Sequence, residues 1–238
     1  MNATELRAWR KALRDDLLTK RLAVPHDTLS AWRVRIDTTL DAAFPNLARG
    51  VVGLCWPFQN EYDARHLARH LRERGGVTAL PVVVAPRAPL EFREWHPGVV
   101  MQNGVYDIPY PTGTRVVTPT TLLIPMNGFD RAGYRLGYGG GFFDRTLAAL
   151  AERGAKPGTI GVTFELAAIE TIQPQPHDIP MDFVVTERGV YRRDASGLVF
   201  LGLPPATAST VSLSSPVCYA DELDPGYFGD TAQPRNNR

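Results

Sequence analysis

Apolar residues recur at helical spacing near the start of the chain. In residues 4–22 they stand three or four positions apart with basic residues between them, at Leu6, Trp9, Leu13, Leu17 and Leu18. This spacing predicts an amphipathic helix. A second helix is predicted to begin near Asp27 or Thr28, because either side chain can cap it, and to end before Pro45.

Strand-like and helix-like segments alternate beyond these two helices. The expected order is strand 51–56, helix 63–74, strand 77–84, strand 121–124, helix 142–153, strand 159–164, strand 183–186 and strand 198–201. Such alternation predicts an α/β fold with a largely parallel sheet covered by helices. Residues 85–120 are rich in proline and aromatic side chains and lack a period. We expect them to form a long loop over one end of the sheet, with or without a short hairpin.

The composition of the chain changes after Leu203. The run Pro204-Pro205-Ala206-Thr207-Ala208-Ser209 is typical of a linker. We therefore expect one domain at residues 1–203 and a C-terminal appendage at residues 204–238. Residues 218–228 mix apolar and aromatic side chains with acidic ones, and are expected to be either docked or disordered. With 44% hydrophobic residues among 238, the chain can bury the core of one such domain.

The overall charge excludes some classes of partner. The chain carries 26 Lys and Arg against 25 Asp and Glu, a formal net charge of +1. This balance gives no whole-molecule attraction for nucleic acid or for an anionic membrane, so any binding of anions must be local. We expect small-molecule partners, no nucleic acid, no membrane, and a monomer or small homo-oligomer.

The cysteines and the N-terminus indicate a cytoplasmic protein. Cys55 and Cys218 are the two cysteines, and their distance in sequence and the apolar run around Cys55 favour reduced thiols. The first residues carry charges where a signal peptide needs an apolar stretch, and no window approaches the roughly 20 apolar residues that span a bilayer.

A glycine-rich loop is the strongest chemical signal in the sequence. Gly137 and the run Gly139-Gly140-Gly141 stand between a predicted strand and a predicted helix. Their backbone N–H groups can approach an anion, and the following helix adds its positive N-terminal end. Arg135 can pair with phosphate oxygens, and Asp144 can hold a metal ion against them. The loop is not a Walker motif. The plainer alternative is a flexible glycine-rich turn.

The residues around this loop resemble a known family. The sequence runs are IPMNGFD at 124–130, RLGYGGGFFDR at 135–145 and HDIPMD at 177–182. They resemble the signature of 5-formyltetrahydrofolate cyclo-ligases, also called methenyltetrahydrofolate synthetases. The similarity covers roughly the first 190 to 200 residues. It implies a three-layer, Rossmann-like α/β fold of cyclo-ligase type, with ATP on the glycine-rich loop and a reduced folate beside it.

The resemblance also implies a role for each matching residue. ATP-binding positions fall on Arg10, Arg14, Arg135, Leu136, Gly137, Tyr138, Gly139, Gly140, Gly141, Phe142 and Phe143. Folate-binding positions fall on Trp56, Glu61, Tyr138, Gly139, Gly140, Gly141 and Phe142. Mg²⁺ ligands fall on Asp144 and Asp178, and catalytic positions on Arg135 and Asp144.

Each of these residues also has a plainer interpretation. Arg10 and Arg14 could solvate their helix, Trp56 could be core, Asp178 could cap a turn, and Glu61 could belong to the start of a helix. The five histidines form no zinc motif, and zinc is not expected.

The chain departs from the family pattern at a few positions. Tyr110 replaces an expected Glu or Gln, Ala167 stands near an expected Gln, and Phe142-Phe143 replaces a Tyr pair.

The implied activity is the ATP-dependent cyclisation of 5-formyltetrahydrofolate to 5,10-methenyltetrahydrofolate, with release of ADP and phosphate and with Mg²⁺ as cofactor. Two alternatives stay open. The first is a paralogue acting on another formylated or carboxylated small molecule, which Tyr110 and Ala167 motivate. The second is a non-catalytic folate-binding or nucleotide-binding relative, against which the presence of both Asp144 and Asp178 argues.

Overall fold

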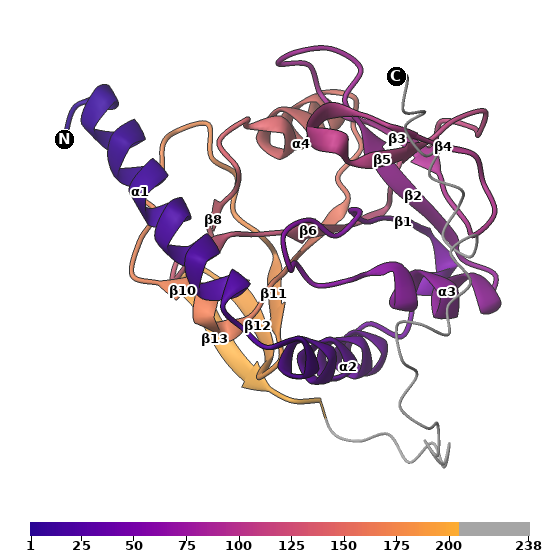
Figure 1. The fold of residues 1–238 in the computed structure, drawn as a ribbon, viewed down its shortest axis with the longest axis horizontal. Helices are drawn as coiled ribbons and strands as arrows, with labels where there is room; N and C mark the ends of the chain where they lie inside the picture. The colour runs from indigo at the N-terminus through magenta and orange to yellow at the C-terminus, as the bar shows by residue number, and fades with distance from the viewer. Residues whose placement is uncertain (205–238) are drawn as a thin grey trace, which may run out of the picture.

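The computed structural model describes residues 1–204, and the fold is drawn in Figure 1. Within them the main sheet has eight strands. In spatial order these are β13 (Gly197–Gly202), β12 (Gly189–Asp194), β11 (Phe183–Thr186), β9 (Gly158–Val162), β6 (Thr121–Pro125), β1 (Val51–Gly53), β2 (Val77–Val82) and β3 (Glu91–Glu94). From β11 to β2 every neighbouring pair is parallel, whereas β3, β12 and β13 join antiparallel at the ends. The predicted α/β class with a largely parallel sheet is confirmed.

Helices cover both faces of this sheet. They are α1 (Ala3–Leu22), α2 (His26–Ala43), α3 (Arg65–Glu73) and α4 (Phe142–Glu152). In Figure 1, α2 and α3 lie on one side of the strands and α4 on the other, while α1 extends along the edge near β8 and β10. Within residues 1–204, no helix combines the length and the apolar character that a membrane crossing needs.

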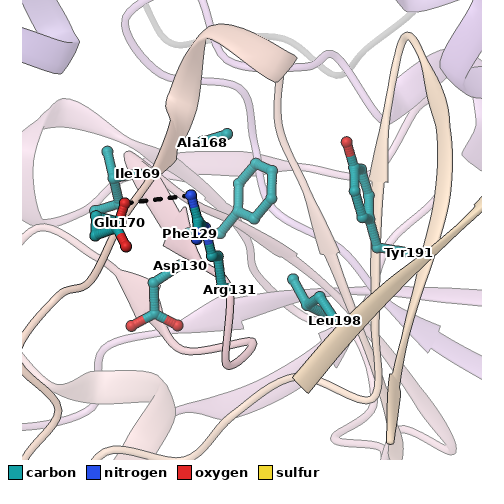
Figure 2. Close-up of a pocket in the computed structure, with 8 residues that line it drawn as sticks. All are labelled: Phe129, Asp130, Arg131, Ala168, Ile169, Glu170, Tyr191 and Leu198. Atoms are coloured by element: carbon teal, nitrogen blue, oxygen red, sulfur yellow. Dashed lines mark ion pairs between the residues drawn. The ribbon is translucent and has the colours of Figure 1, made fainter. Parts of the chain in front are cut away.

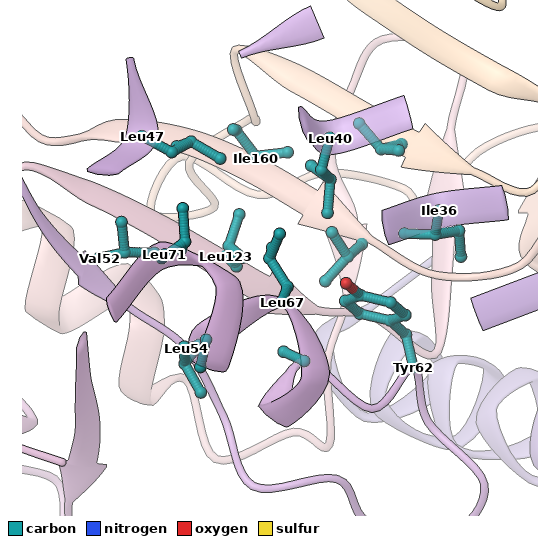
Figure 3. Packing of buried hydrophobic residues seen from close by; sticks show 14 of the residues in the cluster. Ile36, Leu40, Leu47, Val52, Leu54, Tyr62, Leu67, Leu71, Leu123 and Ile160 are labelled. Atoms are coloured by element: carbon teal, nitrogen blue, oxygen red, sulfur yellow. The ribbon is translucent and has the colours of Figure 1, made fainter. Parts of the chain in front are cut away.

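The alternating side chains of the strands supply two separate cores. Residues directed toward α2 and α3 include Val52, Leu123, Ile160 and Val185, which pack with Ile36 and Leu40 of α2 and Leu67 and Leu71 of α3 (Figure 3). Their sequence neighbours Leu122, Ile124 and Val184 point the other way and pack with Leu147 of α4. This period-two pattern explains why these strands are apolar throughout, since both faces are buried.

Two small sheets complete the described chain. Strand β7 (Gly128–Asp130) pairs with β8 (Arg135–Leu136) and β10 (Ala168–Ile169), and β4 (Met101–Asn103) pairs with β5 (Pro109–Pro111). Short 3-10 helices η1 (Leu47–Arg49), η2 (Val105–Asp107) and η3 (Glu165–Ala167) lie between the longer elements. Residues 85–120 thus contain the hairpin β4–β5, as the sequence allowed, and also β3, which was not predicted.

Several predicted boundaries were wrong by a few residues. The strand expected at 51–56 ends at Gly53, although Leu54 still donates its N–H to the Ala79 carbonyl. Helix α2 begins at His26 with Pro25 at the N-cap position, so Asp27 and Thr28 lie inside its first turn and do not cap it. Strand β12 was missed because its second half, Arg192 to Asp194, is polar and exposed and so lacks apolar alternation.

The order of the strands creates a switch point between β1 and β6. From β1 the chain crosses through α3 to β2, and from β6 it crosses through α4 to β9, on the opposite side of the β1–β6 pair. Ligands of open α/β sheets bind at the carboxyl ends of the strands at such a reversal. The loops that follow β1 and β6 are therefore the expected walls of a site, and they contain Glu61 and the glycine-rich loop.

A buried carboxylate ties α2 to the segment before α3. Asp37 accepts a short hydrogen bond from the Tyr62 hydroxyl and another, 2.6 Å long, from Arg33 Nη1. Burial raises the pKa of Asp37 to about 6, because the loss of hydration outweighs the favourable effects of Tyr62 and Arg33. Folding therefore favours the protonated form of this carboxyl.

This shift predicts a pH-dependent stability. Because the folded-state pKa is raised, the Asp37 contribution is fully present below about pH 4 and is lost as the pH rises through about 6. Relative to Asp37→Asn, the free energy of unfolding of the natural protein should fall by about 3 kcal/mol across this window and then stay level. Urea unfolding at a series of pH values measures it. Asp41→Asn, on the same helix but partly exposed, is the control, and an equal slope for both variants would contradict the assignment.

Candidate active site at the glycine-rich loop

The glycine-rich loop joins β8 to α4 and needs glycine at two positions. Gly139 has φ of +92° and Gly141 has φ of +62°, values in the left-handed region that L side chains rarely adopt. Gly141 is the N-cap of α4, and no side chain within residues 1–204 hydrogen-bonds there as a cap. The first N–H groups of α4 therefore face outward at the positive end of the helix, as an anion site requires.

Two arginines on one face of α1 contact the glycine-rich loop and the segment that contains Asp178. Arg14 donates from Nε to the Gly137 carbonyl at 2.7 Å, and a Cβ placed on Gly139 would lie 3.3 Å from its guanidinium carbon. Arg10, one turn earlier, donates to the carbonyls of Ile172 and Gln173. Burial first, and then the charge of Arg10, lower the pKa of Arg14. A bound anion would relieve this repulsion.

Two carboxylates lie at the start of α4, each paired with an arginine. Asp144 Oδ1 lies 2.7 Å from Arg135 Nη2 and accepts the Ile179 N–H at 3.0 Å. Asp178 Oδ2 accepts from Arg10 Nη2 at 2.6 Å and from the Gln175 N–H at 2.7 Å. Burial opposes ionisation of Asp178, but these contacts outweigh it and lower its pKa. Asp178 is thus held as a carboxylate.

Arg135 lies beneath the loop and not on its surface. Its side chain is 5% exposed, and Nη1 donates to the Ile179 carbonyl at 2.8 Å. Although Nη2 is close to Asp144, it forms no aligned hydrogen bond within residues 1–204. This guanidinium holds the start of α4, Asp144 and the segment around Ile179 together.

The carboxylate pair fits Mg²⁺ better than a zinc-like ion. In the described part of the chain, no three His, Cys, Asp or Glu side chains gather closely enough to hold a metal. Mg²⁺ is ordinarily bound by one or two carboxylates, together with substrate phosphates and water. Asp144 uses Oδ1 for both of its contacts, and Asp178 uses Oδ2 for its hydrogen bonds. Each therefore has a second oxygen outside these hydrogen bonds, and that of Asp178 lies 3.9 Å from His177 Nε2.

On the other wall, Glu61 is joined directly to the glycine-rich loop. The Tyr138 hydroxyl donates to Glu61 Oε1 at 2.7 Å and accepts from Arg21 Nη2 at 3.0 Å. The Tyr138 ring packs edge-on against Phe58, with 5.8 Å between centroids. These contacts bring the loops after β1 and β6 together, as the strand order predicts. Arg21 and Phe58 were not among the residues singled out from the sequence.

A sequence signal for Arg21 did exist. Arg10, Arg14 and Arg21 stand at intervals of four and seven residues, so they share one face of α1. Phe58 had no comparable signal, because loop residues have no periodicity.

Trp56 was interpreted from the sequence either as a folate-binding residue or as a core residue, and its contacts have features of both. It packs against the core between the sheet and α2 and α3, meets Trp95 edge-on at 6.2 Å, and carries the Arg65 guanidinium 4.6 Å above its ring. Its surroundings are those of a partly buried core residue, although it follows β1 at the same edge as Glu61. Arg10 pairs with Asp178 and Arg135 with Asp144, while Arg14 is bonded to the glycine-rich loop.

The positions that depart from the family pattern occupy different environments. Ala167 is buried in the core beside α4. Tyr110 lies on the β4–β5 hairpin, where its hydroxyl donates to Gln102 Oε1 at 3.1 Å. The substitution at Tyr110 therefore changes the side chain presented on the β4–β5 hairpin, whereas the substitution at Ala167 changes packing in the core.

A separate hollow of about 360 Å³ lies between β7 and β10 on one side and β12 and β13 on the other (Figure 2). It is lined by Phe129, Asp130, Arg131, Ala168, Ile169, Glu170, Tyr191 and Leu198. Arg131 and Glu170 pair across its mouth at 3.3 Å but are 80% and 76% exposed, so their attraction is weak. None of the residues to which the sequence assigned a binding or catalytic role lines it, although Phe129 and Asp130 belong to the run 124–130.

The fold and the loop define a class of protein. An α/β sheet with an uncapped helix N-terminus at its switch point, flanked by arginines and two carboxylates, is the arrangement of an enzyme that binds a phosphorylated substrate. The sequence profile of the 5-formyltetrahydrofolate cyclo-ligase family matches residues 6–187. The chain belongs to this family, so the resemblance seen in the sequence is confirmed.

Individual relatives agree with the family assignment. The 5-formyltetrahydrofolate cyclo-ligase of Mycolicibacterium smegmatis is 32% identical over 143 residues, which cover 56% of this chain and 72% of the relative. That of Escherichia coli K12 is 31% identical over 153 residues, covering 62% and 83%. The solved structure of Aquifex aeolicus 5,10-methenyltetrahydrofolate synthetase superposes with a TM-score of 0.67 at 25% identity, covering 81% of this chain and 97% of that one.

A substitution in the loop tests its role. Gly139→Val forces a β-branched residue to φ of +92° and places its Cβ against Arg14, so we expect ATP binding to be lost by at least about a hundredfold. Isothermal calorimetry measures the affinity, and circular dichroism checks that the fold persists. Gly154→Val is the matched control, because Gly154 also has positive φ, of +76°, but lies in open space. Normal ATP binding by a folded Gly139→Val protein would refute the assignment.

Proposed function

We propose that the protein uses ATP to convert 5-formyltetrahydrofolate to 5,10-methenyltetrahydrofolate, with release of ADP and phosphate. The observation that carries this proposal is the glycine-rich loop with Arg14 beneath it and Asp144 in the first turn of α4, in a chain of the cyclo-ligase family. The names of the Mycolicibacterium and Escherichia relatives support it, since both are 5-formyltetrahydrofolate cyclo-ligases.

The nucleotide would lie over the glycine-rich loop. Backbone N–H groups of residues 137–143 would face its phosphates, and Arg14 would supply positive charge from below. Arg10 and Arg135 would act partly through the carboxylates that they hold, because their guanidinium groups are paired with Asp178 and Asp144. The γ-phosphate would then meet positive charge from Arg14 and from the N-terminus of α4, with Arg10 and Arg135 farther away.

The folate would lie toward the loop that follows β1. Glu61 offers carboxylate oxygens as acceptors for N–H groups of a pterin ring. Trp56, five residues before Glu61, and Phe142, four residues after Tyr138, would offer aromatic surface. The formyl oxygen of the substrate would attack the γ-phosphorus and displace ADP. The neighbouring folate nitrogen would then attack the formyl carbon, and phosphate would leave to give the methenyl bridge.

The protein's contribution to these steps is positioning and charge neutralisation. Phosphoryl transfer spreads negative charge over the γ-phosphate oxygens, which the loop amides and arginines would balance. Asp144 and Asp178 would hold Mg²⁺, which when bound neutralises phosphate charge. No nucleophilic side chain is needed, because the substrate oxygen and nitrogen make both attacks.

The two alternatives have distinct signatures. A paralogue for another formylated or carboxylated compound would bind ATP but turn over 5-formyltetrahydrofolate poorly, and Tyr110 on the β4–β5 hairpin is the residue that would favour it. A non-catalytic relative would bind without hydrolysing ATP. We further propose a cytoplasmic enzyme, monomeric or a small homo-oligomer, with its catalytic domain in residues 1–203 and an appendage in 204–238, which lie almost wholly outside the described residues.

The activity can be measured directly. Purified full-length protein should form 5,10-methenyltetrahydrofolate, followed by its absorbance, with one ADP released for each product molecule. Product should be absent without ATP and strongly reduced without Mg²⁺. No product at high enzyme concentration with both present would refute the proposed reaction, and faster turnover of another formylated compound would favour the paralogue.

Asp144→Asn tests the role of the carboxylate. Because the substitution keeps the size and removes the charge, we expect kcat to fall by at least about a hundredfold and the Mg²⁺ requirement to rise. Thermal unfolding should also shift, since buried Arg135 loses its counterion. Glu152→Gln, exposed at the far end of α4, is the control. An unchanged kcat with an unchanged Mg²⁺ dependence would move the metal site elsewhere.

A further inference from the structure

Arg21 is a buried cation whose position on α1 invites a functional explanation. Only 3% of the residue is exposed, although it lies in the last turn of a helix whose neighbouring Lys20 is largely in solvent. Buried charges are costly unless they are paired and hydrogen-bonded. The hydrogen-bond partners of Arg21 therefore indicate which role the buried charge has.

Those partners come from both walls of the site. Arg21 Nε donates to the Gln59 carbonyl at 2.9 Å, and Nη2 donates to the Tyr138 hydroxyl at 3.0 Å. Tyr138 passes the connection on, because its hydroxyl donates to Glu61 Oε1. One guanidinium thus contacts the loop after β1 directly and reaches its carboxylate through the glycine-rich loop.

The loop that Arg21 holds is strained. Gln59 has φ of +50° and Asn60 has φ of +59°, both in the left-handed region although neither is glycine. Such residues persist where surrounding contacts over-determine the backbone, and they cluster at ligand-binding sites. The bond from Arg21 to the Gln59 carbonyl and the bond from the Phe58 N–H to Glu61 Oε2 are two such contacts.

We propose that Arg21 is a positioning residue of this active site, which fixes the Glu61 carboxylate for the folate by clamping Tyr138 and the backbone at Gln59. The inference rests on the proposed function for the identity of the ligand. The contacts by which Arg21 holds Glu61 do not depend on which ligand is bound. Arg21 is assigned a positioning role and not a catalytic one, because its two hydrogen bonds go to Tyr138 and to the Gln59 carbonyl, which hold Glu61 in place.

The charged and titratable groups that face Glu61 determine how its pKa should change when Arg21 is removed. Tyr138 comes from the glycine-rich loop, Arg21 from α1, and Cys55 from the same loop as Glu61 itself. Burial raises the pKa of Glu61, while the Tyr138 hydrogen bond, the Arg21 charge and the Phe58 N–H oppose that rise. Removal of Arg21 should therefore raise the pKa of Glu61 further and leave less carboxylate near neutral pH.

Four variants of the full-length protein test the inference. Arg21→Met removes the charge, Arg21→Lys keeps it without the fork of donors, and Tyr138→Phe removes only the relaying hydroxyl. Lys20→Met is the control, because Lys20 is exposed and its ion pair within residues 1–204 is with Asp16, at 2.7 Å. For each, kcat/KM for 5-formyltetrahydrofolate is measured against pH at saturating ATP, and the Glu61 carboxyl is titrated by ¹³C NMR.

We expect the acidic limb of the profile to move to higher pH in Arg21→Met and Tyr138→Phe, and to be partly restored in Arg21→Lys. The KM for the folate should rise at least about tenfold in Arg21→Met, with kcat changed by less than about threefold. The NMR titration should show the same upward shift of the Glu61 pKa without any turnover. Lys20→Met should match the natural protein in every measurement.

An unchanged Glu61 titration in folded Arg21→Met and in Tyr138→Phe would overturn the inference. If Arg21→Met fails to fold, Arg21→Lys decides, because it keeps the buried charge but cannot reproduce both hydrogen bonds to Gln59 and Tyr138, and an unchanged Glu61 titration in that variant would overturn the inference. The proposed function fails separately, as absence of methenyltetrahydrofolate from the natural protein. A shifted Glu61 titration in that case would keep the positioning role and reject the substrate.

Discussion

Parallel strands can be joined only by a crossover, and the right-handedness of crossovers decides where this protein's site lies. Because β1 continues to β2 on one side and β6 continues to β9 on the other, helices α3 and α4 are placed on opposite faces of the sheet. The loops that leave β1 and β6 then emerge side by side at the carboxyl edge. One carries Glu61, and the other carries the glycine-rich loop, which is why a single hydroxyl can bridge them.

Helix α1 turns this edge of the sheet into a charged site. Arg10, Arg14 and Arg21 lie along one face of the helix and contact, in order, the Asp178 segment, the glycine-rich loop and the Glu61 loop. A chain with almost no net charge thus gathers cations locally. The carboxylates Asp144 and Asp178 offset part of that charge, through ion pairs with Arg135 and Arg10.

Much of the fold follows from local patterns. The apolar periodicity predicted the four long helices and most central strands, because burial on one face of a helix or both faces of a strand leaves a mark at fixed intervals. The segments that escaped prediction are short, lie at an edge as β3 does, or are partly polar. Strand β12 is polar along its exposed half, and β7, β8 and β10 have two or three residues each, which is too few for a period to show.

The sequence by itself determined the chemistry available at the site: glycines at 139 and 141, arginines a turn apart on α1, and aspartates at 144 and 178. These are local signals, set by spacing and by backbone conformations that glycine alone adopts freely. Only the tertiary structure decided that Arg135 lies buried against Asp144, that Trp56 packs into the core, and that Arg21 reaches Glu61 through Tyr138. Residues 21, 61 and 138 are far apart along the chain, and no periodicity links them, because their meeting depends on the order of strands in the sheet.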